Sequence, residues 1–279
     1  MTKKAKRTFF KSSKPRIKKI KLRKLFKWQK TGSASSRDKF LVKKTKQRVR
    51  DSILILDFGS QYTQLIARRI RENKVFCQIV PYNITAEEIQ ALTPKGLILS
   101  GGPMSVYDEG APKPRAEIFK LGLPVLGICY GMQVMTDMLG GKVDRSKGRE
   151  FGRAELFVDS NADLFANLPS NLTCWMSHGD EIKKMPPGFA RVAHTLNAEV
   201  AAFANRAKKF YGVQFHPEVV HTQRGAQILM NFTIQICGCL PRWTMDKFID
   251  ASIKQIQETT GNKKVVLGLC GGVVSSVVA

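Results

Sequence analysis

Two short segments of the chain carry residue types that could do covalent chemistry together. Residues 127–131 read Gly-Ile-Cys-Tyr-Gly, which has the form of a nucleophile elbow, a sharp turn that exposes a reactive side chain between a strand and a helix. Residues 216–218 read His-Pro-Glu and could supply a base with a carboxylate to orient it. We therefore predict that Cys129, His216 and Glu218 form a triad that cleaves amide bonds through a thioester.

Each segment also has a simpler interpretation. A cysteine that follows a buried strand is most often a small apolar core residue, and a His-Pro-Glu sequence can be an ordinary surface turn. The flanking glycines and the histidine partner favour catalysis at Cys129, because a helix N-terminus and a nearby imidazole both stabilise a thiolate.

A third segment, Ser-Gly-Gly-Pro at 100–103, contains two glycines and follows another apolar run. Glycine lets backbone N–H groups approach a developing oxyanion. We expect the backbone N–H groups of Gly102 and Tyr130 to form an oxyanion hole, although an ordinary glycine turn would have the same sequence.

The elements that would position these residues alternate between strand and helix. The continuous apolar run at 53–56 is typical of a buried parallel strand. We expect further strands at 75–80, 96–99 and 124–128, and helices at 61–73, 86–92, 115–121 and 131–139. From 142 to 215 short strand-like segments predominate, such as 154–158 and 210–215, before a closing helix at 222–237. This order predicts an α/β fold, with an open, mostly parallel sheet flanked by helices and an antiparallel extension that ends at the His216 loop.

The net charge of +24 is concentrated at one end of the chain. Residues 1–50 hold 21 of the 46 basic residues and one of the 22 acidic residues. We predict that residues 1–51 are a basic, disordered extension. A nucleic-acid arm, a targeting peptide and an appendage without a role in the chemistry remain open. Any nucleic-acid binding through residues 1–50 would be nonspecific and sensitive to salt.

The cysteines and the hydropathy exclude several classes of protein. The six cysteines form no C-x-x-C pair, which favours a reducing, cytoplasmic location. Cys237-Gly238-Cys239 could be a metal or redox pair, but two ligands close no zinc site, and a helix end capped by Gly238 is favoured. We expect no metal site. No apolar run approaches the roughly 20 residues of a membrane span, so no membrane association is expected.

Six segments together resemble, in order and spacing, the class I glutamine amidotransferase domain of glutamine-hydrolysing GMP synthetase. They lie at 55–62, 100–103, 127–133, 149–152, 175–180 and 211–218. The resemblance covers residues 52–238 and implies an amidotransferase domain at 52–240. It implies that Cys129 attacks the side-chain amide of L-glutamine, that ammonia leaves, and that water releases glutamate from the thioester without a cofactor.

The resemblance also suggests residues around the substrate. Gln133 matches a position that helps to hold glutamine, and Ser177, His178 and Asp180 match a loop near the pocket. Substrate-side and structural roles of His178 remain open. The remaining histidines, His194 and His221, match nothing catalytic.

Residues 241–279 resemble a linker helix followed by the start of an ATP pyrophosphatase domain. The helix, at 245–260, carries an apolar stripe that we expect to pack in a core or between domains; it comprises Phe248, Ile249, Ile253 and Ile256. A strand at 265–269 leads into the loop at 270–276. The family loop reads Ser-Gly-Gly-Val-Asp-Ser-Ser, whereas Cys270 and Val274 replace its first Ser and its Asp here.

The altered loop limits what the resemblance implies about nucleotides. The full family uses ATP and Mg²⁺ to adenylate xanthosine monophosphate and make GMP. Four residues could still contact phosphate: Gly271, Gly272, Ser275 and Ser276. With the carboxylate missing and the chain ending at Ala279, we do not expect ATP binding to function here.

Two functions follow from these observations. The first is the glutaminase part of GMP synthetase, a ligase of purine biosynthesis, with L-glutamine as substrate and a separate synthetase domain as a candidate partner. The alternative is a non-catalytic product of a truncated or disrupted GMP synthetase gene, which the altered loop and the early end of the chain favour.

Overall fold

The structure is a computed structural model, and it describes residues 51–261 of the 279-residue chain. The predicted basic extension, apart from Asp51, lies outside the described residues. So do the predicted strand at 265–269 and the loop at 270–276, including all four candidate phosphate contacts.

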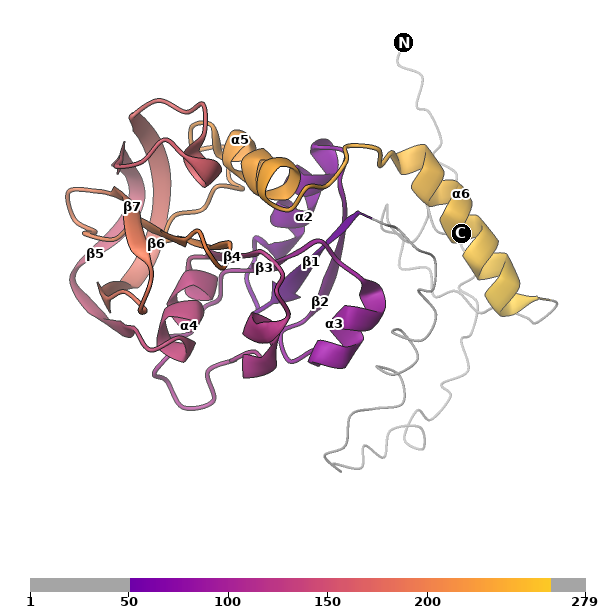
Figure 1. Cartoon of the computed structure of the whole chain (residues 1–279), viewed down its shortest axis with the longest axis horizontal. Coiled ribbons are helices and arrows are strands. Elements are labelled where there is room, and N and C mark those ends of the chain that lie inside the picture. Colours follow the sequence, from indigo (N-terminus) through magenta and orange to yellow (C-terminus); the bar gives the residue numbers. More distant parts are fainter. Residues whose placement is uncertain (1–50, 262–279) are drawn as a thin grey trace, which may run out of the picture. The chain divides into compact units, whose positions relative to one another are not determined.

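One nine-stranded sheet organises the described residues, in the order β2-β1-β3-β4-β9-β8-β7-β5-β6 (Figure 1). The strands are β1 (Ser52–Asp57), β2 (Phe76–Pro81), β3 (Gly96–Leu99), β4 (Val125–Ile128), β5 (Lys142–Val158), β6 (Asn171–Lys184), β7 (Ala190–His194), β8 (Ala202–Asn205) and β9 (Phe210–Val213). The pairs from β2 through β1, β3 and β4 to β9 are parallel, and those from β9 through β8, β7 and β5 to β6 are antiparallel. The predicted parallel sheet with an antiparallel extension is confirmed.

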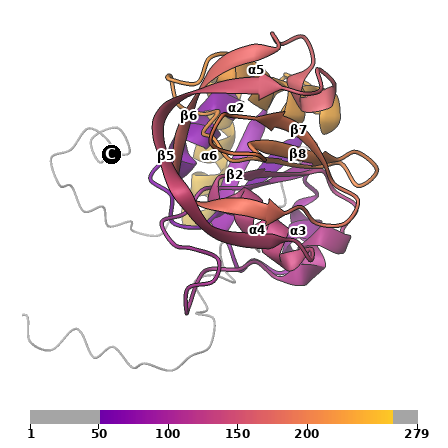
Figure 2. The ribbon, with the colours of Figure 1, turned by 90° about the vertical axis from the view of Figure 1, so that its left-hand side faces the viewer.

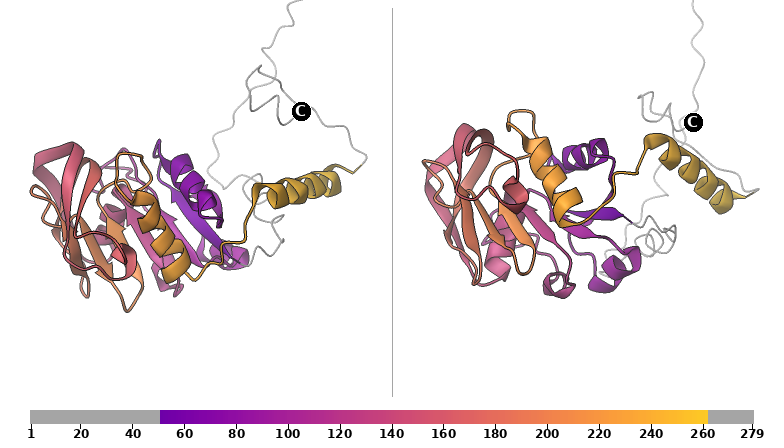
Figure 3. Two further views of the ribbon diagram at one scale, coloured as in Figure 1. Left: turned by 90° about the horizontal axis from the view of Figure 1, so that it is seen from above. Right: turned by 45° about the horizontal axis from the view of Figure 1, so that its top comes forward.

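Helices cover both faces of the parallel strands, as Figures 1 and 3 show. The helices are α2 (Thr63–Glu72), α3 (Ala86–Leu92), α4 (Tyr130–Met138), α5 (Gly225–Met230) and α6 (Met245–Thr260). Alternate side chains of β1 enter two different cores because strand residues point to opposite faces in turn. Ile53 and Ile55 pack in the core under α2 and α5, whereas Leu54 and Leu56 pack in the core under α3 and α4.

The antiparallel half differs from the prediction of short strands. β5 has 17 residues and β6 has 14, and both curve across the end of the molecule in Figure 2. In β6, buried residues alternate with more exposed ones. Its sequence therefore lacks the continuous apolar run by which the parallel strands are recognised. The register between β5 and β6 shifts twice, between Lys142 and Val143 and again between Arg145, which pairs with Asp180, and Glu150, which pairs with His178.

Two predicted helices also differ in detail. The segment at 115–121 forms a 3₁₀ helix over Ala116–Lys120, a common form for so short a connector. The closing helix begins at Gly225 and continues beyond α5 as a π-helix over Asn231–Ile236. Cys237 ends that helix and Gly238 follows with φ +67°, which confirms the helix-end interpretation of this cysteine pair.

The helix α6 coincides with the predicted range of 245–260. Its Ile249, Ile253 and Ile256 are 47%, 49% and 58% exposed. The expected packing of this stripe in a core is therefore not found within residues 51–261. In that same part of the chain, no helix combines the length and the apolar character needed to cross a bilayer.

Candidate active site

Cys129 lies at a strained turn between β4 and α4. Its φ of 52° and ψ of −109° are unusual for a residue with a side chain. The turn brings backbones so close that a Cβ on Gly127 would lie 2.6 Å from the Gly131 carbonyl, and a Cβ on Gly131 would lie 2.2 Å from the Leu99 oxygen. Cys129 N donates to Val213 O at 2.8 Å. The sequence therefore specifies the elbow through Gly127 and Gly131, because any larger residue at either position would force the neighbouring backbone to move.

His216 and Glu218 meet immediately beyond β9. His216 Nδ1 lies 2.8 Å from Glu218 Oε1, and both side chains are buried. The ring of Tyr62 packs edge-on against the imidazole, with centroids 5.2 Å apart. Burial alone would lower the pKa of His216, but its hydrogen bonds with Cys129 and Glu218 outweigh that effect and raise the pKa to about 10. The structure thus brings the three predicted triad residues together.

Two glutamines line the other side of the sulfur. Gln214 Nε2 lies 3.8 Å from Cys129 Sγ, and Gln133 Nε2 donates to Gln214 Oε1 at 3.3 Å. Gln133, predicted to hold the substrate, is therefore linked to the sulfur through Gln214. Sequence reasoning assigned no role to Gln214, although it lies two residues before His216 in a segment that carries the family resemblance.

The two candidate oxyanion residues, Gly102 and Tyr130, lie in contact with each other. A Cβ on Gly102 would lie 3.1 Å from Tyr130 Cγ, so the backbone of Gly102 packs directly on that ring. Tyr130 is the first residue of α4, and the first N–H groups of a helix have no partner within it. A Cβ on Gly101 would lie 3.4 Å from His216 Cε1. The loop after β3 therefore touches both the elbow and the imidazole.

The segment 177–180 of β6 forms a wall beside the sulfur. Ser177 O accepts a hydrogen bond from Cys129 Sγ at 3.7 Å. Asp180 is buried and its carboxylate accepts hydrogen bonds from Ser105 Oγ at 2.5 Å and Tyr107 Oη at 2.6 Å.

Beside Ser177, His178 is buried and faces Glu150, with 3.5 Å between His178 Nε2 and Glu150 Oε2. Ser105, Tyr107 and Glu150 were not predicted as site residues. Glu150 lies in a segment that carries the resemblance, whereas nothing in the sequence indicates that the two hydroxyls meet Asp180.

The other histidines lie outside this constellation. His194 Nδ1 pairs with Asp159 Oδ1 at 2.9 Å, and the His221 ring packs against Trp175 with centroids 4.7 Å apart and the ring planes tilted by 32°. No group of three or more metal-ligating side chains occurs in the part of the chain that the structure describes.

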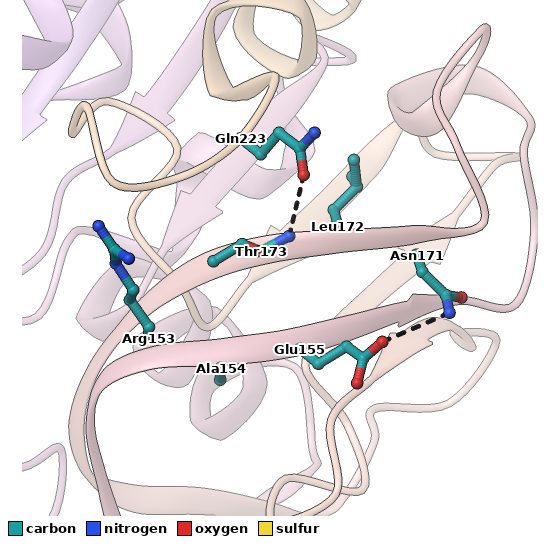
Figure 4. Close-up of a pocket in the computed structure, with 7 residues that line it drawn as sticks. All are labelled: Arg153, Ala154, Glu155, Asn171, Leu172, Thr173 and Gln223. Atoms are coloured by element: carbon teal, nitrogen blue, oxygen red, sulfur yellow. Dashed lines mark hydrogen bonds between the residues drawn. The ribbon is translucent and has the colours of Figure 1, made fainter.

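An open hollow of about 430 Å³ lies over β5 and β6 (Figure 4). Its lining residues are Arg153, Ala154, Glu155, Asn171, Leu172, Thr173 and Gln223. It contains none of the predicted site residues, so the chemistry does not lie in this hollow.

Comparisons with known proteins match the same part of the chain. The family model for class I glutamine amidotransferases matches residues 54–236. The chain is 54% identical over 230 residues to the glutamine-hydrolysing GMP synthase of Caldanaerobacter subterraneus subsp. tengcongensis and 53% identical over 229 residues to that of Bacillus cereus. These alignments cover 82% of this chain but 45% and 44% of the two relatives. The chain therefore spans less than half the length of the curated relatives it matches.

Solved structures show the same fold. A protein from Thermoplasma acidophilum, described as one subunit of a GMP synthase, superposes with a TM-score of 0.58 and 33% identity, over 74% of this chain and 97% of that one. A glutamine amidotransferase from Thermotoga maritima superposes with a TM-score of 0.50 at 22% identity, over 75% of this chain and 96% of that one.

Proposed function

The chain belongs to the class I glutamine amidotransferase family, as the amidotransferase part of the GMP synthase type, and we propose that its Cys129, His216 and Glu218 hydrolyse L-glutamine to glutamate and ammonia. The observation that carries this assignment is the elbow itself. Cys129 occupies a strained backbone conformation that presents its sulfur to a buried His216–Glu218 pair.

In the first half-reaction, Cys129 gives its proton to His216, and the Cys129 sulfur attacks the side-chain carbonyl carbon of glutamine. The backbone N–H groups of Gly102 and Tyr130 stabilise the oxyanion that forms. His216 then donates a proton to the departing nitrogen, so that ammonia leaves and a thioester remains. The raised pKa of His216, about 10, supports this step because the imidazole carries the proton that the leaving group needs.

In the second half-reaction, His216 accepts a proton from water, and the resulting hydroxide attacks the thioester. The carbon–sulfur bond breaks, glutamate leaves and the sulfur regains a proton. Glu218 holds the imidazole in the required orientation throughout, through its 2.8 Å contact with Nδ1. Gln133, Ser177, His178 and Asp180 form the surroundings of the substrate, Ser177 through its backbone.

The ammonia is used to aminate xanthosine monophosphate to GMP, a reaction that requires ATP and Mg²⁺ in a synthetase domain. The similarity to GMP synthases supports this assignment. The synthetase domain can be part of a separate chain, as the description of the Thermoplasma protein as one subunit suggests. The five described cysteines are free, which supports a reducing, cytoplasmic setting.

The test compares the purified wild-type chain with Cys129→Ala in an assay for glutamate released from glutamine. We expect slow release by the wild type alone, and none above the buffer blank by Cys129→Ala. Equal rates in the two proteins would defeat the proposal. A glutamine analogue with an electrophilic carbon, 6-diazo-5-oxo-L-norleucine, should add to the wild type at Cys129, as seen by mass spectrometry. Failure of the folded protein to form this adduct would favour the non-catalytic alternative.

A further inference from the structure

Glu150 is a buried carboxylate to which the proposed mechanism gives no role. It is 8% exposed and lies on β5, opposite His178 of β6. Removing an ionised carboxylate from water costs free energy unless it is paired and hydrogen-bonded. A buried glutamate opposite His178, the neighbour of Ser177, therefore calls for an explanation in terms of its contacts.

Those contacts join three segments of the antiparallel half. Thr195 Oγ1 lies 3.2 Å from both carboxylate oxygens of Glu150, and Asn197 Nδ2 donates to Oε1 at 3.4 Å. On the other side, His178 Nε2 lies 3.5 Å from Oε2. Glu150 thus links its own strand to β6 and to the segment that follows β7.

The contacts of His178 place its Nε2 atom opposite the Glu150 carboxylate. His178 Nδ1 lies 2.9 Å from the carbonyl oxygen of Asp180, which can only accept, so Nδ1 carries a proton. Nε2 has no hydrogen-bond acceptor nearer than the Glu150 carboxylate among the described residues. Burial would raise the pKa of Glu150, but the contacts with His178, Asn197 and Thr195 lower it. The Glu150 carboxylate, 3.5 Å away, is therefore the acceptor that faces Nε2.

The pair lies beside a shift in the register of the β5–β6 ladder. Arg145 pairs with Asp180 and Glu150 pairs with His178, so the register changes between these two pairs. A Cβ on Gly179 would meet no described atom within 4 Å, so the backbone here is not confined by packing. The contacts of the Glu150 side chain with His178 therefore join the two strands at the register shift.

We propose that Glu150 is a positioning residue, which through His178 holds Ser177 of β6 against Cys129 and so fixes the wall on which glutamine binds. The carbonyl of Ser177, the neighbour of His178, lies 3.7 Å from the sulfur. A small displacement of this wall changes the binding geometry of the substrate without changing the sulfur or His216. This inference rests on the proposed glutamine hydrolysis, and it makes a separate structural claim about β6.

The test uses Glu150→Gln, with Glu155→Gln as the matched control. Glu155 lies on the same strand, and its carboxylate accepts only a 3.5 Å bond from Asn171 among the hydrogen bonds of the described residues. Hydrogen–deuterium exchange of the peptide containing residues 177–179 measures the position of the wall without reference to activity. We expect exchange at least about tenfold faster in Glu150→Gln and unchanged in Glu155→Gln.

Two alkylating reagents then separate substrate binding from thiol chemistry. The half-saturating concentration of 6-diazo-5-oxo-L-norleucine should rise about tenfold in Glu150→Gln, whereas the rate of alkylation by iodoacetamide should stay within about twofold of wild type. Unchanged hydrogen exchange would overturn the proposal, and so would unchanged saturation by the analogue. If wild type and Cys129→Ala release glutamate equally, the proposed hydrolysis fails, and hydrogen exchange still decides whether Glu150 positions β6.

Glu150→Gln removes a buried carboxylate that faces His178 and is hydrogen-bonded by Thr195 and Asn197, and this loss can prevent folding. The uncharged double variant Glu150→Gln with His178→Gln covers that outcome, because two amides can hydrogen-bond across the same pair of strands. We expect it to fold and to recover most of the wild-type saturation by the analogue. The single variants Glu150→Gln and His178→Gln are measured beside it. If the factor by which the half-saturating concentration rises in the double variant equals the product of the factors in the two single variants, the two side chains act independently and the pairing is overturned.

Discussion

The two halves of the sheet hold the candidate site by different physical means. In the parallel half, close backbone contact fixes the sulfur: a Cβ on Gly131 would lie 2.2 Å from the Leu99 oxygen. In the antiparallel half, a Cβ on Gly179 would meet no described atom within 4 Å, and pairs of polar side chains hold the wall instead. The difference indicates that close backbone packing fixes the position of Cys129, whereas hydrogen bonds between polar side chains fix the position of the wall beside it.

Alanine substitution at these two glycines tests the contrast most directly. Gly131→Ala should lower the free energy of unfolding by at least about 4 kcal/mol and abolish glutamate release. The reason is that the new Cβ would clash with the backbone carbonyl of Leu99, which cannot move aside as a flexible side chain could. Gly179→Ala should stay within about 0.5 kcal/mol of wild type. Urea denaturation measures both values, and equal losses would show that the two halves do not differ in this way.

Replacing the base should affect chemistry and leave binding intact. His216→Asn should reduce kcat for glutamine hydrolysis by about 10³-fold, within the range for a general acid–base, and should change KM by less than about threefold. His221→Asn, which alters a histidine packed against Trp175, serves as the control and should retain wild-type kinetics. A large rise in KM with little change in kcat for His216→Asn would show that His216 acts in substrate binding. That result would contradict the assignment of the chemistry to the parallel half of the sheet.

The buried imidazole should also make stability depend on pH. The pKa of His216 is raised from 6.5 to about 10, so the folded state favours the protonated form. Its contribution to stability is fully present below pH 6.5 and is lost as pH rises through about 10. The difference in unfolding free energy between wild type and His216→Asn, measured by denaturation from pH 6 to pH 10, should therefore shrink as pH rises. If this difference in unfolding free energy grew with pH instead, folding would lower the pKa of His216 rather than raise it.

The smallest effect is expected from a single hydroxyl in the antiparallel half. Tyr107→Phe removes the donor that lies 2.6 Å from Asp180 Oδ1, while Ser105 still donates to the other oxygen. Stability should fall by about 1–2 kcal/mol, and KM for glutamine should rise by about threefold to tenfold without a change in kcat. Tyr82→Phe provides the matched control. A lower kcat at unchanged KM would show that this side of the wall contributes to the chemistry.

The sequence is most informative where structure is local. Gly127 and Gly131 flank Cys129 at the spacing that an elbow requires, and the clashes that a Cβ would cause explain why both are glycine. The apolar run of β1 predicts a strand buried on both faces, and Ile53 and Leu54 do enter opposite cores.

The rest depends on partners far apart in the chain. Asp180 meets Tyr107 from 73 residues away, and no periodicity indicates such a contact. β5 begins with charged residues that read as a loop, yet pairing with β6 extends the strand to 17 residues. The side-chain pair of Glu150 and His178 becomes visible only once the register of the β5–β6 ladder is known.

The backbone at Cys129 has a consequence for transplanting this chemistry into other proteins. A non-glycine residue at φ 52° and ψ −109° costs about 1–3 kcal/mol, so the turn exists only because its surroundings impose it. Those surroundings are Gly127, Gly131, the Leu99 carbonyl and the bond from Cys129 N to Val213 O. A cysteine placed alone in a new scaffold would not adopt this backbone conformation. A design that transfers the chemistry must therefore include the strained turn together with the closely packed strands that hold it.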